Sequence, residues 1–327
     1  MGAAEKRQYD ESRHKTARSA PHAAVTPRGI LVAAPLECEN PREGGLSYDP
    51  FQRISLPNAL ARVKDERSAV RFARAYGLLG YADFLNFQWQ DLTLVDRRRM
   101  FDDPLLDEGQ LKELLRSLDD YGDPMPWLLA QARSVRLAME LIEAIGRKEF
   151  KAVRDVVLRH TLPHVGSDQK SRPQLLVAGG PSVKWFAPGR GLLHPDMEAM
   201  RARSAAYLIE ELVNPNVASL RWQLFTPAYR GPNELEIELG FEHRALFEVV
   251  WWHVANAAFG RRPGTRVRLC ELETCRAPFI VTDERQRFCP ADYTYTDKRT
   301  GKARPGRSRC AALYQKRHGG QSKTEKP

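Results

Sequence analysis

The chain has 327 residues, 42% hydrophobic and 9% aromatic, a globular composition that excludes a largely disordered protein. Its 51 Lys and Arg outnumber 41 Asp and Glu, for a formal charge of +10 at pH 7. Residues 261–327 hold 17 basic and seven acidic side chains, so this surplus lies wholly near the C-terminus. We therefore expect a flexible leader over residues 1–50, a neutral body over 51–260 and a small basic module over 261–327.

Two features of the chain bear on its location. No stretch approaches the roughly 18 uninterrupted apolar residues of a membrane span, and the charged start leads into no apolar segment of a signal peptide. Four of the five cysteines cluster near the C-terminus, which fits a metal site in a reducing compartment better than a disulfide framework. We expect a cytoplasmic protein without membrane contact, in which Cys38 is an inert thiol.

The body is predicted to be mainly helical with a few β-strands, an α+β fold. Ser55 and Pro57 suit a helix start, and the apolar positions after them predict a helix that ends at Gly77. The clearest helix runs from Pro126 to Ile145, where apolar residues recur every three or four positions. The other predicted elements are helices at 108–118 and 152–160, a hairpin of strands 174–177 and 183–186, a helix at 195–212, a strand at 220–225 and a helix at 244–259.

The body offers no recognisable catalytic constellation. The turn at 178–182 lacks the Lys and Ser or Thr that complete a phosphate-binding loop. His160 and His164 have the spacing of a helical metal pair, but Pro163 disfavours a helix at the residue before it, so the two rings are not expected to share a face. We therefore predict that the protein is not an enzyme.

The C-terminal module contains the residues that point to a metal. Four residues separate Cys270 from Cys275, which lets both sulfurs reach one ion from a tight turn. Thirteen residues then lead to Cys289, and they predict a return strand at 278–281 and a turn at 283–285. Paired with 266–269, that strand makes the hairpin of a zinc ribbon. Because zinc selects soft thiolate sulfur, we predict one structural Zn²⁺ ion per chain.

The identity of the fourth ligand follows less clearly from the spacing of the cysteines than that of the first three. Twenty residues separate Cys289 from Cys310, which opens a short basic helix predicted over 310–318. We favour Cys310 because a helix N-terminus stabilises a thiolate, and His318 and Asp292 stay open as substitutes. The predicted metal ligands are therefore Cys270, Cys275, Cys289 and Cys310. Four thiolates would close the zinc site and leave no open position for a substrate.

Short segments around the cysteines form a pattern: Arg268-Leu269-Cys270, Cys275-Arg276-Ala277-Pro278-Phe279, Arg287-Phe288-Cys289, and Cys310 with the basic residues after it. Over about 50 residues, this pattern resembles the bacterial proteins with a C-terminal CGNR-type zinc finger. The resemblance implies a helical N-terminal domain, a bound zinc and a role in transcription regulation or nucleic-acid binding. One departure is that the last cysteine begins Cys310-Ala311-Ala312-Leu313 after a long insert, where the family has Cys-Gly-Asn-Arg soon after the third cysteine.

The basic residues of the module predict contact with nucleic-acid phosphates. On the insert, expected to be an exposed loop, and on the final helix these residues are Lys298, Arg299, Lys302, Arg304, Arg307, Arg309, Lys316 and Arg317. Arginine can bind guanine edges bidentately, so Arg304, Arg307 and Arg309 are candidates for base contacts. Three tyrosines could stack on unpaired bases: Tyr293, Tyr295 and Tyr314. We predict a DNA-binding transcription regulator, with RNA left open.

Two other interpretations use the same residues. The charges can form an ordinary solvated surface, or the zinc unit can be a docking surface for a protein partner or a second copy of the chain. In the second interpretation the helical body senses a ligand or partner. A continuous positive face around the metal would favour nucleic acid over both.

Overall fold

A computed structural model describes the larger part of the chain and confirms the predicted fold class. Helices dominate it, and every sheet is small and antiparallel. The helix predicted at 108–118 lies outside the described residues. These are 17–18, 23–25, 29–33, 47–48, 50–81, 122–162, 174–193, 198–225, 238–243, 245–259, 267–281, 283, 285–291, 294–296, 303–305 and 308–318.

None of the helices within these ranges combines the length and the apolar character needed to cross a membrane.

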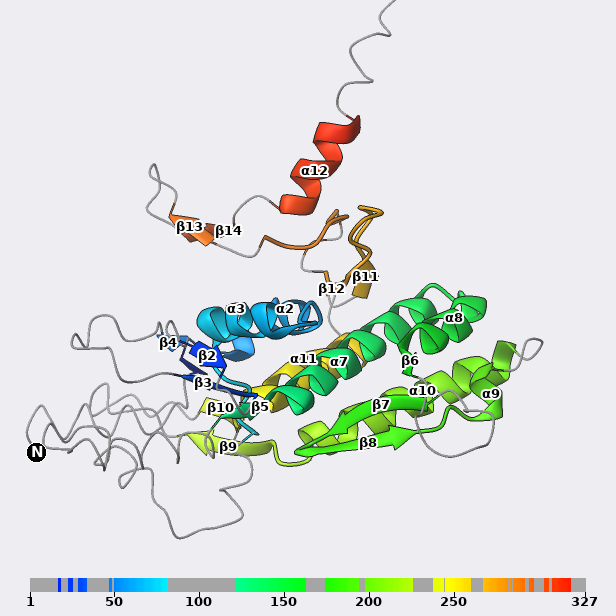
Figure 1. Cartoon of the computed structure of the whole chain (residues 1–327), viewed down its shortest axis with the longest axis horizontal. Coiled ribbons are helices and arrows are strands. Elements are labelled where there is room, and N and C mark those ends of the chain that lie inside the picture. Colours follow the sequence, from blue (N-terminus) through cyan, green and yellow to red (C-terminus); the bar gives the residue numbers. More distant parts are fainter. Residues whose placement is uncertain are drawn as a thin grey trace, which may run out of the picture. The chain divides into compact units, whose positions relative to one another are not determined.

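The chain divides into two compact units. Figure 1 labels the helices and strands that belong to them. The first takes its described residues from Met1–Gln52, Asp65–Leu128 and Asn216–Val250. The second takes them from Arg53–Lys64, Leu129–Pro215 and Trp251–Pro327. The four-cysteine segment thus belongs to the same unit as much of the helical body.

In the first unit, short strands come from the expected leader. β2 (Ala23–Val25), β3 (Ile30–Ala33) and β5 (Asp123–Pro124) form one antiparallel sheet in the order β2-β3-β5. A second pair joins β1 (Ala17–Arg18) to β4 (Ser47–Tyr48), ahead of the short helix η1 (Pro50–Gln52). Leu31 of β3 is fully buried, so this part of the chain contributes to the core.

The single helix predicted from Ser55 to Gly77 is wrong, because the structure has two helices there. They are α2 (Leu56–Leu60), in the second unit, and α3 (Glu66–Tyr76), in the first. Asp65 begins α3 with a capping box: its carboxylate accepts from the Ser68 N–H at 2.8 Å, and the Ser68 hydroxyl accepts from the Asp65 N–H at 3.1 Å. Asp is a preferred N-cap residue, and the apolar pattern that runs through it hid the break.

A buried carboxylate holds the segment that follows α3. Helix α3 ends at Gly77, whose φ of +93° favours glycine. The backbone N–H groups of Leu79, Gly80 and Tyr81 all donate to the carboxylate of Asp123, which is fully buried. The Asp123 side chain therefore accepts hydrogen bonds from three successive backbone N–H groups that have no acceptor within a helix or a sheet.

The first unit also contains β9 (Arg221–Phe225), the predicted strand, which pairs with β10 (Glu238–Glu242). Helix α11 (Leu246–Phe259) begins in this unit, where Phe247 packs edge-on against Trp127 at 5.6 Å between ring centroids.

The second unit confirms the predicted helices and hairpin of the body. Two long helices are α7 (Met125–Gly146) and α8 (Phe150–His160). Strand β6 (Thr161–Leu162) and the hairpin of β7 (Gln174–Gly179) and β8 (Ser182–Phe186) form a sheet in the order β6-β7-β8. Two further helices follow, the short α9 (Arg190–Leu193) and α10 (Glu198–Val217), which starts later than predicted and continues past Pro215.

Buried polar side chains fix α7 within this unit. Gln131 donates to the Gly180 carbonyl at 3.0 Å and accepts from the Trp251 indole N–H at 2.8 Å. His160 lies 3.4 Å from the Glu140 carboxylate, an ion-pair partner, while His164 lies outside the described residues. With only one of the two histidines described, the expectation about the His160–His164 pair stays a prediction.

Candidate metal centre

The predicted hairpin is present and places the first two cysteines. Strands β11 (Val267–Leu269) and β12 (Pro278–Ile280) pair antiparallel, and Cys270 follows β11 directly. The Cys270 N–H donates to the Ala277 carbonyl at 3.0 Å, and the Cys275 N–H donates to the Leu272 carbonyl at 2.8 Å. Both sulfurs therefore come from the tight turn at the end of this hairpin, as the four-residue spacing predicts.

The segment before Cys289 is tied to that turn. Asp283 makes the predicted bend, accepting from the Arg285 N–H at 2.8 Å through its carboxylate. The Glu271 N–H donates to the Arg287 carbonyl at 3.1 Å, and the two side chains form an ion pair. These contacts bring the third cysteine back to the first two.

Helix α12 (Arg309–His318) brings the fourth cysteine. Ser308 precedes the helix, and its hydroxyl accepts from the Ala311 N–H at 3.3 Å. Cys310 is thus in the first helical turn, and Tyr314, one turn later, packs on Phe288 with 5.0 Å between ring centroids. A small core joins the three segments: Cys270, Leu272, Ala277, Phe279, Val281 and Cys289, with Cys275, Phe288, Cys310 and Tyr314 packed against it.

All four predicted sulfurs converge. Those of Cys270, Cys275, Cys289 and Cys310 lie within 4.8 Å of one another, and the Cys275 and Cys289 sulfurs are 3.6 Å apart. Zn–S bonds of about 2.3 Å in a tetrahedron place neighbouring sulfurs roughly 3.8 Å apart, so the spacing fits one ion. The four cysteines could therefore hold a metal ion. Of the two alternative ligands, Asp292 lies outside the described residues, and for His318 only the backbone is described.

The electrostatics of the four thiols also suit a cation. Hydrogen bonds with Cys270 and Cys289 lower the pKa of Cys275 far below its usual range. Hydrogen bonding with Cys270 raises the pKa of Cys289, and burial raises the pKa of Cys310 to about 12. Metal ligation requires deprotonated thiols. A bound cation would therefore displace the protons of Cys289 and Cys310.

Two arginines from the helical body add positive charge near the sulfurs. Arg136 of α7 donates through Nε to the Ala61 carbonyl at 2.7 Å and is attracted electrostatically to Cys275. Arg62 has a favourable electrostatic interaction with Cys289. A site of four thiolates and one divalent cation has two net negative charges, which such arginines offset.

A buried hydrogen bond connects the hairpin to α2. The Ile280 N–H of β12 donates to the Asn58 side-chain oxygen at 2.7 Å, and Asn58 is 2% exposed. The two residues are 222 positions apart, so the sequence carries no local signal for this contact. Asn58, Arg62 and Arg136 are the residues near the site that sequence reasoning missed.

We expect Asn58→Ala to lower the free energy of unfolding of the second unit by about 1–3 kcal/mol, because it strands the buried Ile280 N–H. Urea denaturation would measure the change. Ser55→Ala is a matched control from the same segment, since Ser55 makes no side-chain capping bond, and its effect should stay within about 0.5 kcal/mol. Equal effects of the two substitutions would contradict the structural role of Asn58.

The predicted nucleic-acid contacts are only partly described. Side chains are described for Arg309, Lys316 and Arg317, all exposed on α12. The insert is no plain loop, because β13 (Thr294–Thr296) and β14 (Ala303–Pro305) form a hairpin in which Arg304 pairs with Tyr295. The alternating Thr-Tyr-Thr segment is a β-strand signal that the loop prediction overlooked. The remaining four residues lie outside the described ranges: Lys298, Arg299, Lys302 and Arg307.

Neither family models, nor curated proteins, nor solved structures give a match to this chain. The resemblance to CGNR-type zinc-finger proteins therefore rests on the residues around the four cysteines alone and stays a prediction.

Proposed function

We propose that this chain is a zinc-binding, nucleic-acid-binding protein that acts in the cytoplasm as a DNA-binding transcription regulator, related to the CGNR-type zinc-finger proteins. The observation that carries the proposal is the convergence of four cysteine sulfurs beside an exposed basic helix. An all-thiolate donor set favours zinc, and its closed coordination assigns the metal a structural role.

The exposed side of α12 supports contact with phosphates. Arg309, Lys316 and Arg317 are at helix positions i, i+7 and i+8, which lie on one face, and all three are exposed. Cys310 and Tyr314 pack against the metal module. Arg309 and Lys316 lie away from these two residues and face solvent, and Arg317, seven positions after Cys310, is exposed at the edge of the packed side.

Arg287 lies beside this basic surface but adds little free charge to it. Its guanidinium lies 5.9 Å from the ring centroids of both Phe288 and Tyr314 and forms an ion pair with Glu271. Because the Glu271 carboxylate offsets the charge of Arg287, the three cations of α12 carry the proposed phosphate contact.

The test replaces the three cations of α12 by glutamine: Arg309→Gln, Lys316→Gln and Arg317→Gln. The slope of log affinity against log salt for mixed-sequence duplex DNA should become shallower by roughly 2–3, because each neutralised phosphate contributes about 0.9 to that slope. Zinc content should not change.

The control removes three exposed cations elsewhere in the second unit: Arg133→Gln, Lys151→Gln and Arg154→Gln. It removes the same charge and should keep the wild-type slope. A wild-type slope in the α12 variant, with zinc fully bound, would reject direct DNA contact by this helix.

One observation favours the alternative, a zinc-stabilised protein-interaction module. Leu313 is 41% exposed on the same face of α12 as Arg309. An apolar side chain among cations suits a protein surface better than a phosphate backbone. If the α12 variant retains DNA binding, Leu313→Glu becomes the substitution that tests protein docking.

A further inference from the structure

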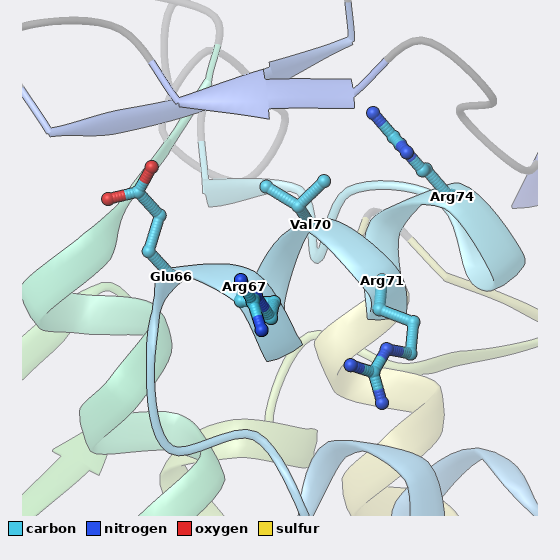
Figure 2. A pocket seen from close by; sticks show the side chains of 5 residues that line it. All are labelled: Glu66, Arg67, Val70, Arg71 and Arg74. Carbon is cyan, nitrogen blue, oxygen red and sulfur yellow. The ribbon is translucent and has the colours of Figure 1, made fainter.

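A second cationic surface lies on α3, in the first unit. Arg67, Arg71 and Arg74 are at helix positions i, i+4 and i+7, and all three are exposed. These positions follow one face of a helix over about 10 Å. Together with Glu66 and Val70 they line a shallow hollow (Figure 2). Within the described part of the chain, none of the three arginines is in an ion pair.

The rest of α3 holds this face toward solvent. Ala69, Phe72 and Ala73 are buried and lie on the opposite side of the helix. The capping box of Asp65 and Ser68 fixes the first turn, and Gly77 ends the helix. The three arginines therefore lie on a short capped helix whose opposite side is buried.

The arginines do not converge on one point. Figure 2 shows their guanidinium groups pointing in different directions along the helix. A site for one phosphate group brings several donors onto the same anion, and this arrangement does not. Separate cations spaced along a line suit a polymer that carries regularly spaced charges.

The residue types on this face of α3 favour duplex nucleic acid over a lipid bilayer or a single strand. Its one apolar residue, Val70, is only partly exposed, so α3 offers no large apolar side chain for insertion into a lipid bilayer. No aromatic residue lies on it either, and unpaired bases bind by stacking on aromatic rings. Duplex nucleic acid requires neither, and one strand has a phosphate about every 3.4 Å along the axis, so the row spans about three.

We propose that Arg67, Arg71 and Arg74 of α3 form a second nucleic-acid contact surface that binds the phosphate backbone of a duplex. This surface goes beyond the proposed function, because it lies outside the metal module and uses no metal. It adds affinity without base specificity, since contacts with phosphates carry no direct sequence information.

The experiment compares the full-length protein with the variant Arg67→Gln, Arg71→Gln and Arg74→Gln. Affinity for mixed-sequence duplex DNA is measured by fluorescence anisotropy between roughly 50 and 200 mM salt, a range over which phosphate contacts change affinity strongly. The slope should become shallower by roughly 2–3, and each single substitution should account for about 1. The Lys variant at all three positions should keep the slope, because it keeps the charges.

The control variant Arg133→Gln, Lys151→Gln and Arg154→Gln should behave like the wild type. An equally shallow slope in both variants would overturn the proposal, because net charge alone would then explain it. A wild-type slope in the α3 variant would overturn it as well. So would α3-dependent binding of anionic lipid vesicles or inorganic phosphate with no change in DNA binding.

The α12 variant separates this inference from the proposed function. If it loses DNA binding while the α3 variant does not, the arginine row is a solvated surface and the metal module alone binds. If only the α3 variant loses binding, the metal module has another role and the row stands.

Discussion

Loss of one metal ligand should unfold the C-terminal module. We expect Cys270→Ser, or removal of the metal by a chelator at pH 7, to abolish ordered structure in β11, β12 and α12. Among the described residues, the cluster at the centre of this module has six buried members, two of them cysteines, too few to fold it on apolar burial alone. Bound zinc supplies on the order of 10 kcal/mol to such modules at neutral pH. Hydrogen exchange of these segments and zinc content per chain would measure the result.

Loss of the metal should also affect α2, because the module contacts this helix. Because Asn58 accepts the Ile280 N–H and α2 packs on β12, exchange protection in α2 should fall together with that of β12. Helix α3, in the other unit, should keep its protection. Cys38→Ser is the matched control and should retain the zinc. Unchanged protection of β12 after complete removal of the metal would show that the metal does not hold the fold.

The convergence of the four cysteines was predictable because most of its signals are local. Cys270 and Cys275 flank a turn, and short apolar strands lie on either side of it, so the hairpin follows from residues within one small segment. Cys310 was placed by chemistry, since a helix N-terminus favours a thiolate, and its sulfur does join the other three. The spacing of 20 residues from Cys289 does not by itself distinguish Cys310 from His318 or Asp292 as the fourth ligand.

Contacts across long stretches of chain were not predictable. The Asn58–Ile280 bond and the approach of Arg62 and Arg136 depend on packing between segments that share no sequence pattern. The break between α2 and α3 has a different cause, because the Asp65 and Ser68 signal is local and was outweighed by the apolar period on both sides. A capping box inside an apolar period therefore indicates two helices rather than one long helix.

The distribution of basic residues in the folded chain differs from the distribution along the sequence. Total charge pointed to the C-terminal module alone, since residues 1–260 have equal numbers of basic and acidic side chains. A net charge of zero over these residues does not prevent basic side chains from gathering on one helix face. Arg67, Arg71 and Arg74 share one face of α3, and the acidic residue Asp65 is used as its cap.

The second large effect is expected at Asp123, which positions the segment after α3. Asp123→Ala should lower the free energy of unfolding of the first unit by about 3–5 kcal/mol, because hydrogen bonds to charged groups contribute about 1.5–3 kcal/mol each and three donors lose their acceptor together. Those donors are the N–H groups of Leu79, Gly80 and Tyr81. Denaturant titration monitored by tryptophan fluorescence would report it.

Asp123→Asn separates the charge from the geometry of this contact. Its amide keeps one oxygen of similar position but places an N–H₂ group where the second oxygen accepts from Leu79 or from Gly80 and Tyr81. We therefore expect an intermediate loss of stability. Since Leu79 also accepts from the Phe247 N–H at 3.0 Å, the loss should reach the start of α11 and appear there as faster hydrogen exchange. If alanine and asparagine are both tolerated within about 0.5 kcal/mol, the three N–H groups are satisfied by water, and the carboxylate is not what holds the end of α3 in place.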